Sequence, residues 1–473
     1  MIDKQKLYNT IDENAPEIIA LSDAIWEYAE LSMEEYKSAA YYCELLEKEG
    51  FTVERELCGI PTAFSGSFGS GSPRIGILGE FDALSGLSQV AGSTQKQSLV
   101  PGGNGHGCGH NLLGAGSFGA ALAIKEAIEA GALQGTVIFY GCPGEEGCAG
   151  KTFMARDGMF RDLDAALTWH PGSTNEVTVG SNAACMQVEY SFHGVASHAA
   201  GSPDKGRSAL DAAELMHVGV QFLREHMPPH SSVHYSITDG GGVSPNVVQA
   251  EAKTVFMVRS ETVRKAKELL HRVNNIAQGA ALMTDTQVTT RQIDGTASTV
   301  SNEALEQVMY ENMQQVSIPA YTQEELAFAQ ALHDTCPAAL PGTLSATNRD
   351  IRAFVEEKTD GGKRAMNDFI IPYVPSTIFT PGSTDVGDVS WLTPTAQFTT
   401  ATWVSGTPGH SWQNVSLGKT GIAYKGMLQA AKILAGAAAD LMESPALLEK
   451  IRKEFSKNAA EGYDCPIDKE VTF

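Results

Sequence analysis

The sequence predicts an α/β protein. Its catalytic domain is built on a mostly parallel sheet with helices on both faces and is interrupted by an inserted α+β domain of the ferredoxin-like type. Two observations predict this fold class. Short apolar runs alternate with helical segments in the first part of the chain and again near its end. Between these two parts the elements follow the order βαββαβ. We therefore expect residues 1–184 and 297–473 to form the catalytic domain and residues 185–296 the inserted domain.

The catalytic domain is predicted from local patterns of apolar residues. Between residues 10 and 50 they recur at helical spacing, which indicates two helices separated near Leu31 and Ser32. Farther along, strand-like apolar runs alternate with helical stretches, and strands separated by helices are typical of a parallel sheet. The expected strands are 74–81, 135–141, 164–170 and 396–406, and the expected helices are 111–130 and 421–442.

The inserted domain is predicted in the same way. Its expected strands are 185–193, 232–238, 249–259 and 286–293, and its expected helices are 207–226 and 261–282. Residues 320–382 differ from both domains because they are rich in Pro, Thr, Gly and charged residues and show weak periodicity. We expect an irregular insertion there.

Composition and charge exclude several classes of function. The 473 residues include 34 Lys and Arg against 56 Asp and Glu, which gives a net charge of −22. Nucleic acid and anionic membranes repel such a chain, so we expect neither as a partner. No apolar run is long enough to span a membrane, and the N-terminal segment lacks a signal-peptide pattern. The 8 cysteines have no repeated spacing, which is typical of reduced thiols, so we expect a soluble cytoplasmic protein.

The side chains that can bind metal follow the ends of predicted strands or precede a predicted helix. They are Cys108, His110, Glu145, Glu146, His170 and His410. In an open parallel sheet, ligands bind beyond the carboxyl ends of the strands, so separate segments deliver these groups to one edge. Taken singly, a Cys-x-His pair, a Glu-Glu corner or a buried histidine is more often incidental. Their joint placement favours a site.

The residue types in this set indicate a pair of divalent ions. Thiolate, imidazole and carboxylate together suit Zn, Mn, Co or Ni. Two ions need about five or six protein ligands, with a position left for water. We assign Glu146 to metal binding and Glu145 to general acid/base work, because adjacent carboxylates after a strand can point in different directions.

Several segments resemble one family. GEFDALSGLSQVAG, NGHGCGHNLLG, FYGCPGEEG, ALTWHP and GTPGHSWQ are similar to motifs of the dimetal aminoacylase and carboxypeptidase amidohydrolases, and the resemblance runs from the N-terminal helices to the DCPI segment near the end of the chain. It implies two Mn or Zn ions per chain and Glu145 as the catalytic carboxylate. It implies metal binding at Cys108, His110, Glu146, His170 and His410.

The resemblance also implies a role for the inserted domain. In this family that domain is a lid that dimerises, and a lid histidine reaches the partner's site and stabilises the tetrahedral intermediate. His198 occupies the matching position. Asn246 and Arg259 match lid residues that hold the carbonyl and the free carboxylate of the substrate, and a guanidinium suits bidentate binding of a carboxylate. A surface salt bridge is the alternative interpretation of Arg259.

Four acidic residues outside this set need separate interpretation. Glu80 and Asp82 lie where related metallopeptidases carry a His-x-Asp pair, and the replacement of histidine by Glu80 argues against direct metal binding there. We expect Asp82 to orient a metal ligand from the second shell of the site, with a structural capping role as the alternative. Asp385 and Asp388 lie in a loop that the family places near the site, and we assign them no role.

These interpretations predict a metal-dependent amidohydrolase that cleaves the amide bond of an N-acyl or N-aroyl amino acid. The resemblance favours p-aminobenzoyl-glutamate as the substrate. A general N-acyl-amino-acid hydrolase or a dipeptidase is one alternative. A regulatory subunit that needs a paralogous catalytic partner is another, so we expect either a homodimer or a heteromer with a paralogous subunit.

Overall fold

The computed structural model describes residues 2–337 and 339–473, which form two compact units. The first unit contains the chain up to Gly180 together with Val300–Ile378 and Val389–Gly462. The second unit contains Ser181–Thr299, Phe379–Asp388 and Tyr463–Phe473. The last two of these segments fall outside the inserted domain as the sequence delimits it.

The first unit is built on a seven-stranded sheet with the order β1-β2-β4-β3-β5-β15-β6. Its four central strands, β4, β3, β5 and β15, run parallel to one another, and the strands at both sides pair antiparallel. The bounds are β1 Thr52–Arg55, β2 Phe64–Ser70, β3 Arg74–Glu80, β4 Gly135–Cys142, β5 Ala165–Gly172, β6 Glu176–Val177 and β15 Thr395–Ala401. The parallel centre confirms the predicted fold class and places several strand ends at one edge.

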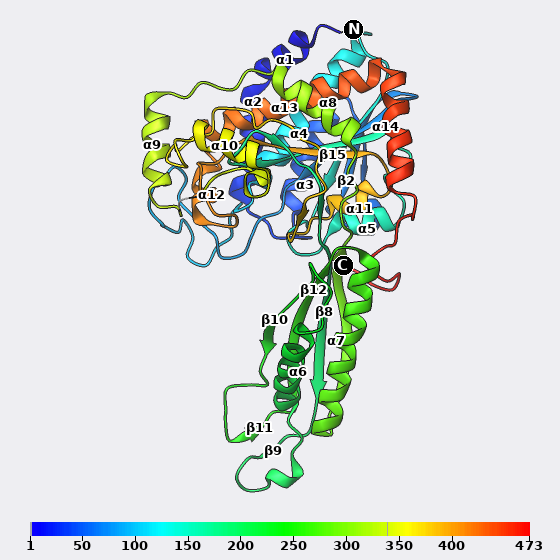
Figure 1. The fold of residues 1–473 in the computed structure, drawn as a ribbon, viewed down its shortest axis with the longest axis vertical. Coiled ribbons are helices and arrows are strands. Elements are labelled where there is room, and N and C mark those ends of the chain that lie inside the picture. The colour runs from blue at the N-terminus through cyan, green and yellow to red at the C-terminus, as the bar shows by residue number, and fades with distance from the viewer. Residues whose placement is uncertain (1, 338) are drawn as a thin grey trace. The chain divides into compact units, whose positions relative to one another are not determined.

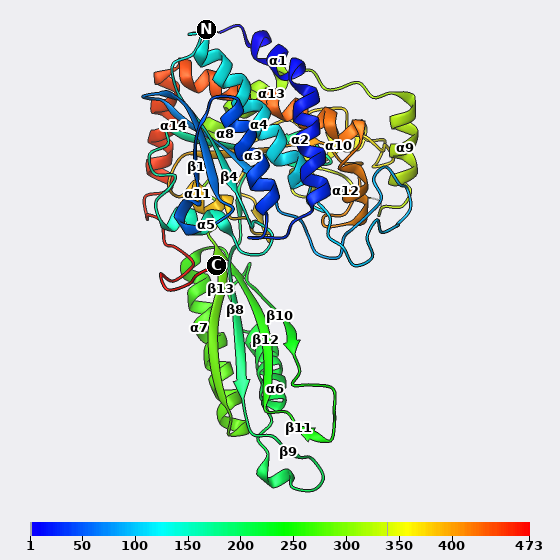
Figure 2. The same cartoon turned by 180° about the vertical axis from the view of Figure 1, so that it is seen from behind.

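Helices cover this sheet. The long helices α4 (His110–Glu129) and α13 (Gly421–Glu443) pack against each other and against the central strands, and α1 (Lys4–Glu13) and α2 (Ala15–Tyr28) pack on them (Figure 2). On the opposite face Tyr140 packs against Phe160, with ring centroids 5.1 Å apart. The remaining helices are α3 Tyr36–Lys48, η1 Leu57–Gly59, α5 Gly150–Arg156, α8 Glu303–Gln315, α9 Gln323–His333, η3 Thr343–Ala346, α10 Arg349–Lys358, α11 Val386–Ser390, α12 Trp412–Leu417 and α14 Pro445–Asn458.

The N-terminal helices and the 320–382 insertion differ from the predictions. The predicted break near Leu31 is present between α2 and α3, but α1 ends at Glu13 and Pro16 lies in the first turn of α2. The prediction of an irregular insertion is wrong, because α9 and α10 lie in it. Thr322 and Glu325 form a capping box at the start of α9, and Asn348 caps α10. These caps stabilise helices whose apolar pattern is weak.

The second unit has the predicted ferredoxin-like order. Its antiparallel sheet has the order β10-β12-β8-β13, and α6 and α7 pack on one face of it (Figure 1). The main bounds are β8 Ala184–His193, α6 Ala209–Arg224, β10 Ser232–Asp239, β12 Glu251–Ser260, α7 Val263–Thr284 and β13 Gln287–Thr296. The short elements are β7 Ser181–Asn182, β9 Ser197–His198, η2 Pro203–Lys205, β11 Val247–Val248 and β14 Phe379–Thr380.

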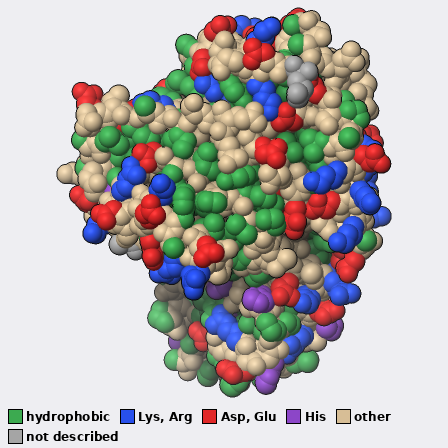
Figure 3. All heavy atoms as spheres, turned by 45° about the horizontal axis from the view of Figure 1, so that its top comes forward, with side chains coloured by type: hydrophobic (Ala, Val, Ile, Leu, Met, Phe, Trp, Pro, Cys, Tyr) green, Lys and Arg blue, Asp and Glu red, His purple; other side chains and the backbone are tan. Residues whose placement is uncertain are grey.

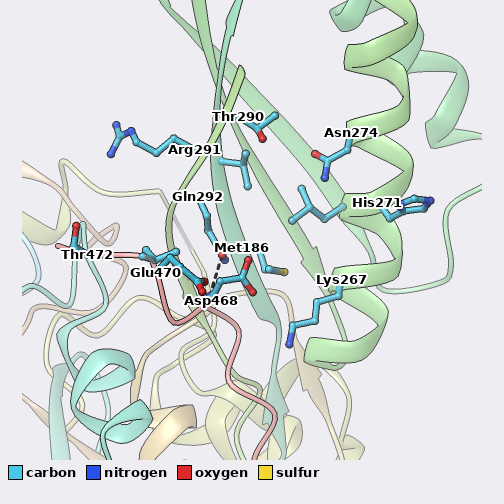
Figure 4. Close-up of a pocket in the computed structure, with 13 residues that line it drawn as sticks. Met186, Lys267, His271, Asn274, Thr290, Arg291, Gln292, Asp468, Glu470 and Thr472 are labelled. Carbon is cyan, nitrogen blue, oxygen red and sulfur yellow. Dashed lines mark hydrogen bonds between the residues drawn. The ribbon is translucent and has the colours of Figure 1, made fainter. Parts of the chain in front are cut away.

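The C-terminal segment Tyr463–Phe473 belongs to the second unit and lies beside α7 and β13. Lys267 contacts Asp464 at 2.6 Å, and Gln292 donates to the carbonyl of Pro466 at 2.7 Å. A pocket of about 550 Å³ lies between this segment, α7, β8 and β13, and Figure 4 shows side chains of both charges around it. None of the predicted site residues lines this pocket.

The surface carries both signs of charge. On the face shown in Figure 3, Lys and Arg side chains are scattered among Asp and Glu side chains. Within the described parts of the chain, no helix has the length and apolar character needed to cross a bilayer.

Candidate active site

Cys108 and His110 are placed by a tight turn at the start of α4. Gly109, between them, has a φ of +78° and forms the N-terminal cap of the helix. A Cβ atom at this position lies 3.0 Å from Pro171 Cβ, so a side chain is disfavoured by both space and backbone conformation. The glycine therefore lets the Cys-x-His pair approach the end of β5.

Glu145 and Glu146 lie in the loop after β4, and two buried carboxylates hold this loop. The backbone N–H of Gly144 donates to Glu35 Oε1 at 2.9 Å, and the N–H of Glu146 donates to Asp82 Oδ2 at 2.9 Å. These bonds place the two adjacent carboxylates beside the start of α4.

The two remaining histidines enter the site differently from what the sequence predicts. His170 lies within β5 and not beyond its end. The strand expected over 396–406 ends at Ala401, so His410 lies in a longer connection that leads to α12. His410 has a φ of 53°, and its side chain is 55% exposed.

The structure brings the six predicted groups together in the first unit. Cys108 Sγ lies 3.4 Å from His170 Nε2, and His410 Nε2 lies 3.3 Å from Glu146 Oε2. The ligand atoms form two groups, each within 4.8 Å: Cys108, His110 and His170, and Cys108, Glu146 and His410. Cys108 is common to both, as expected for a thiolate shared by two ions. A third group contains Glu80, His110 and Glu145.

The chemistry of these donors fits divalent metal ions. His110 Nε2 and Glu146 Oε1 are buried and have no hydrogen-bond partner among the described residues. Buried polar atoms normally have a partner, so two such atoms in one site are unusual. A sulfur, imidazole nitrogens and a carboxylate at these spacings are a ligand set suited to Zn or Mn.

Asp82 orients His110. Its Oδ1 lies 2.8 Å from His110 Nδ1, and its Oδ2 also accepts from Ser32 Oγ at 2.8 Å. Burial alone raises the pKa of Asp82, but the hydrogen bond and charge of His110 with the other donors lower it to about 2. An ionised carboxylate only accepts, so Nδ1 of His110 donates to it and Nε2 is the nitrogen that faces the site. Burial lowers the pKa of His110, but the charge of Cys108 and the hydrogen bond with Asp82 raise it well above its ordinary value.

Glu80 and Lys151 add a buried ion pair. Lys151 Nζ lies 2.8 Å from Glu80 Oε1, and Glu80 Oε2 lies 3.2 Å from His110 Nε2. Burial raises the pKa of Glu80, but the charges of Lys151 and His110 lower it below its ordinary value. Sequence reasoning missed Lys151. The only signal was a lysine within KTFMA, a segment whose residues are all buried in α5.

Two histidines of this region have lowered pKa values but different surroundings. Burial lowers the pKa of His170 to about 4, so its ring is neutral near pH 7 and suited to metal binding. The pKa of His106 is also lowered to about 4, but its Nε2 lies 2.9 Å from the carbonyl of Ile25 and the side chain belongs to the core. Burial raises the pKa of Cys108, so a nearby cation is needed to stabilise the thiolate.

The predicted lid residues lie in the second unit. His198 is exposed in β9, and its Nδ1 accepts from the N–H of Gly201 at 2.9 Å, which leaves the proton on Nε2. Asn246 is exposed, and its backbone carbonyl accepts from the N–H of Ala199 at 3.0 Å. Arg259, in β12, donates to Ser383 Oγ at 3.3 Å.

The two loop aspartates are also part of the second unit. Asp388 accepts from the N–H of Ala297 at 2.9 Å and from the hydroxyl of Tyr463 at 2.7 Å, so it joins three segments of this unit. Burial and then the charge of Asp385 raise the pKa of Asp294. These contacts indicate a structural role for Asp388.

Comparisons with known proteins identify the family of the chain. The family model of peptidase family M20/M25/M40 matches residues 77–345. The chain is 43% identical to one of the subunits of p-aminobenzoyl-glutamate hydrolase of Escherichia coli K12, and the alignment covers 99% of each chain. It is 30% identical to the Xaa-Arg dipeptidase of Mus musculus, over 96% of this chain and 92% of that one.

A solved structure shares the fold. The aminobenzoyl-glutamate utilization protein of Klebsiella pneumoniae superposes with a TM-score of 0.59 at 17% identity, over 92% of this chain and 98% of that chain. The family match spans more than half of the sequence and both relatives align over nearly all of it. The chain therefore belongs to peptidase family M20/M25/M40 and is a hydrolase.

Proposed function

We propose that this hydrolase cleaves the amide bond of N-aroyl amino acids, with p-aminobenzoyl-glutamate as its principal substrate. The observation that carries the reaction type is the pair of ligand groups that share Cys108, with Glu145 beside them. The name of the E. coli relative, 43% identical over the full length, supports the substrate. Pocket shape and fold alone do not define a substrate.

The mechanism assigns a task to each side chain. Cys108, His110, Glu146, His170 and His410 would hold two divalent ions, which would supply Lewis-acid activation of water and of the scissile carbonyl. Glu145 accepts the proton of the attacking water and delivers it to the leaving nitrogen. His198, with its proton on Nε2, donates a hydrogen bond to the oxyanion. Asn246 contacts the carbonyl, and Arg259 binds the free carboxylate of the amino acid.

The lid residues support an assembly of at least two chains. His198 follows the end of β8 that pairs with Glu251, whereas Arg259 pairs with Cys185 at the other end of that strand. The intervening length of β12 is on the order of 25 Å, and Figure 1 shows β9 and β11 at one end of the unit. One lid therefore cannot present both side chains to one small substrate, which favours a partner that supplies His198.

The partner is either a second copy or a paralogous subunit, because the E. coli relative is itself named as one subunit of its hydrolase. An apolar patch on the second unit suits such contact: Leu215, Val218, Phe222, Tyr235 and Ile237 are exposed on α6 and on the edge strand β10. We call these five residues the lid patch.

The experiment that tests the proposal is hydrolysis of p-aminobenzoyl-glutamate by the purified chain after metal removal and reconstitution with Mn or Zn. Metal-dependent release of glutamate by the chain alone supports the substrate and independence from a second subunit. Activity that appears only when a paralogous subunit is added supports the heteromer. Absence of release in both arms, with metal bound, contradicts the proposed substrate.

A dipeptidase is the second candidate, because the mouse relative is an Xaa-Arg dipeptidase. A panel that varies the acyl group and the amino acid independently separates the two. A higher kcat/KM for p-aminobenzoyl-glutamate than for any dipeptide supports the first proposal, and the reverse order supports the dipeptidase.

A further inference from the structure

The proposed function leaves open what holds His410 beside the other candidate ligands. His410 lies in the connection between β15 and α12, and its side chain is 55% exposed. Its φ of 53° lies in the left-handed region, which residues other than glycine adopt rarely. Such a backbone conformation persists only where contacts with the rest of the protein hold it. The contacts around this connection therefore decide where the imidazole lies.

The end of α9 holds the connection on both sides of His410. His333 Nδ1 donates to the carbonyl oxygen of Ser405 at 2.7 Å, and Gln413 Nε2 donates to Thr335 Oγ1 at 3.4 Å. These two hydrogen bonds fix the connection against α9. They do not link it to the turn that carries the Cys-x-His pair.

Asn414, in the first turn of α12, supplies that link. Its side chain is buried, and its Nδ2 donates to the carbonyl oxygen of Gly107 at 2.8 Å and to that of Pro408 at 3.1 Å. Gly107 directly precedes Cys108. Pro408 lies two residues before His410, and a Cβ atom at Gly107 lies 3.4 Å from His410 Cα. One amide group thus bridges the two segments that carry a thiol and an imidazole of the site.

The partners of this amide set its orientation. Carbonyl oxygens only accept hydrogen bonds, so the nitrogen of Asn414 faces them and the oxygen points away. Its Oδ1 is buried and has no partner among the described residues. A buried acceptor without a partner costs free energy, so the stability of the fold alone does not explain an asparagine here.

Asn175 has the contrasting arrangement. Its Nδ2 also donates to two backbone carbonyls, those of Asn367 at 3.0 Å and Phe369 at 3.1 Å. Its Oδ1 accepts from the N–H of Ala401 at 3.0 Å, so both polar atoms of the side chain are paired. None of these three partners is a candidate ligand or adjoins one. Asn175 is therefore a buried bridging asparagine that serves as a matched control.

We propose that Asn414 is a positioning residue of the metal site, which sets the distance between Cys108 and His410 and so completes the ligand group that these two share with Glu146. This inference deepens the proposed function and rests on it for the presence of ions. The other ligand group depends less on this bridge, because its two histidines lie on regular elements, at the start of α4 and within β5. Loss of the bridge should therefore affect one of the two ions.

The test measures metal binding without turnover. Metal-stripped wild-type protein and variants are titrated with Co²⁺ by calorimetry, and spectra record the d–d bands and the charge-transfer band of the Cys108 thiolate. Asn414→Asp keeps the shape of the side chain, but an ionised carboxylate cannot donate to the two carbonyls. Asn414→Ala removes the amide without adding a charge and decides the same question if Asn414→Asp does not fold. Asn175→Asp and Asn175→Ala are the controls, and circular dichroism and thermal unfolding show which variants fold.

We expect wild-type protein to bind two Co²⁺ per chain. The Asn414 variants should bind one of the two about 10–100-fold more weakly, as is common when a partner that orients a ligand is removed, and the other with little change. Their thiolate band should weaken because Cys108 then contacts one ion. The Asn175 variants should lose thermal stability but keep both affinities and the spectrum.

A double-mutant cycle separates positioning from an independent effect. If Asn414 acts through His410, Asn414→Ala adds little to the loss that His410→Ala already causes. The double variant should then bind the weaker ion as His410→Ala alone does. Additive losses contradict the proposal, because Asn414 then acts without His410.

Two ions bound with wild-type affinity and spectrum in the Asn414 variants overturn the inference. An equal loss in the Asn175 variants also overturns it, because the effect is then one of general stability. Failure of both Asn414 variants to fold does the same, since the residue is then needed for the fold itself.

Failure of the proposed function gives a different result. Wild-type protein that binds two Co²⁺, loses one of them in the Asn414 variants and hydrolyses no N-acyl amino acid contradicts the function and leaves the role of Asn414 standing. Wild-type protein that binds fewer than two Co²⁺ contradicts both.

Discussion

At the scale of single residues, Asp82 connects three parts of the candidate site through one carboxylate. It contacts His110 Nδ1, Ser32 Oγ and the backbone N–H of Glu146. The side chain therefore fixes the tautomer of one proposed ligand and the backbone position of another. Partners of this kind commonly affect metal affinity as strongly as some ligands do.

Replacement of Asp82 tests this role. We expect Asp82→Asn to lower metal affinity by roughly 10–100-fold, because an amide cannot accept from all three donors. Chelator competition with Zn or Mn measures the change. Ser32→Ala is the matched control, because it removes one donor to the same carboxylate and should have a smaller effect. Equal affinities for Asp82→Asn and wild type contradict the role.

Glu145 is tested by an isosteric change that removes its capacity to take a proton. We expect Glu145→Gln to bind two metal ions and to fold normally, yet to lose about 10²–10⁴-fold in kcat. Metal analysis and steady-state kinetics on the same preparation measure both properties. Glu13→Gln, at an exposed position of α1, is the control. Near-normal kcat in Glu145→Gln is incompatible with the assigned proton transfer.

At the scale of elements, Glu35 ties the N-terminal region to the loop that carries the adjacent carboxylates. Its Oε1 accepts from the N–H groups of Met33 and Gly144, and its Oε2 accepts from Thr62 Oγ1, each at 2.9 Å. Burial and the charge of Asp82 raise the pKa of Glu35 to about 8. A neutral side chain with one carbonyl oxygen can therefore replace it.

This arrangement predicts a difference between two variants. Glu35→Ala should lower kcat by roughly 10–100-fold, because the loop that positions Glu145 loses its anchor. Glu35→Gln should retain most of the activity, since its amide oxygen can accept both backbone N–H groups and its amide nitrogen can donate to Thr62. Kinetics of the two variants over pH 6–9 provide the comparison. A loss of equal size in both variants shows that the backbone bonds are not what matters.

Strand β13 carries a pH-sensitive contribution to the stability of the second unit. Burial and the charge of Asp385 raise the pKa of Asp294 to about 7, although Arg259 opposes this shift. An acid whose pKa is raised on folding stabilises the folded form most when both states are protonated. That contribution is lost as pH rises from about 4, the ordinary pKa, to about 7.

We therefore expect Asp294→Asn to be more stable than wild type at pH 8, by ~2–4 kcal/mol in the unfolding transition of the second unit, with little difference at pH 4. Denaturant unfolding at both pH values measures this. Asp204→Asn, at an exposed position of the same unit, should show no such pH dependence. A constant difference between Asp294→Asn and wild type across pH 4–8 contradicts the prediction.

At the scale of the whole molecule, the lid patch predicts assembly. Exposed Phe222, Val218 and Leu215 form one stripe of α6, next to the edge strand β10. A charge introduced there should reduce dimerisation because it must be desolvated in the interface. We expect Phe222→Glu to shift the mass of the particle toward the monomer in light scattering. Leu282→Glu, at an exposed position of α7, should leave the mass unchanged.

Activity links this assembly to catalysis. If the partner supplies His198, Phe222→Glu should lose activity in proportion to the loss of dimer, although its first unit is unaltered. A monomeric Phe222→Glu protein with full activity contradicts the shared site.

The sequence alone determined the features that depend on short segments. Short apolar runs indicated the strands, and the candidate metal ligands were singled out because each was expected next to a strand end or a helix start. The ferredoxin-like order was predicted for the same reason, since every element of that unit has its own local pattern. His110 and Asp82, by contrast, were connected only through a resemblance and through the placement of Asp82 at a strand end.

Only the tertiary structure decided the contacts between segments that carry no local signal. Lys151 and Glu80 are far apart in the chain, and nothing in KTFMA or GEFDAL indicates that they pair. Individual side chains of α7 and β13 donate hydrogen bonds to the backbone of Tyr463–Phe473, which belongs to the second unit. The physical reason is that periodicity records which face of an element is buried, whereas the partner of a buried charge is set by packing between elements.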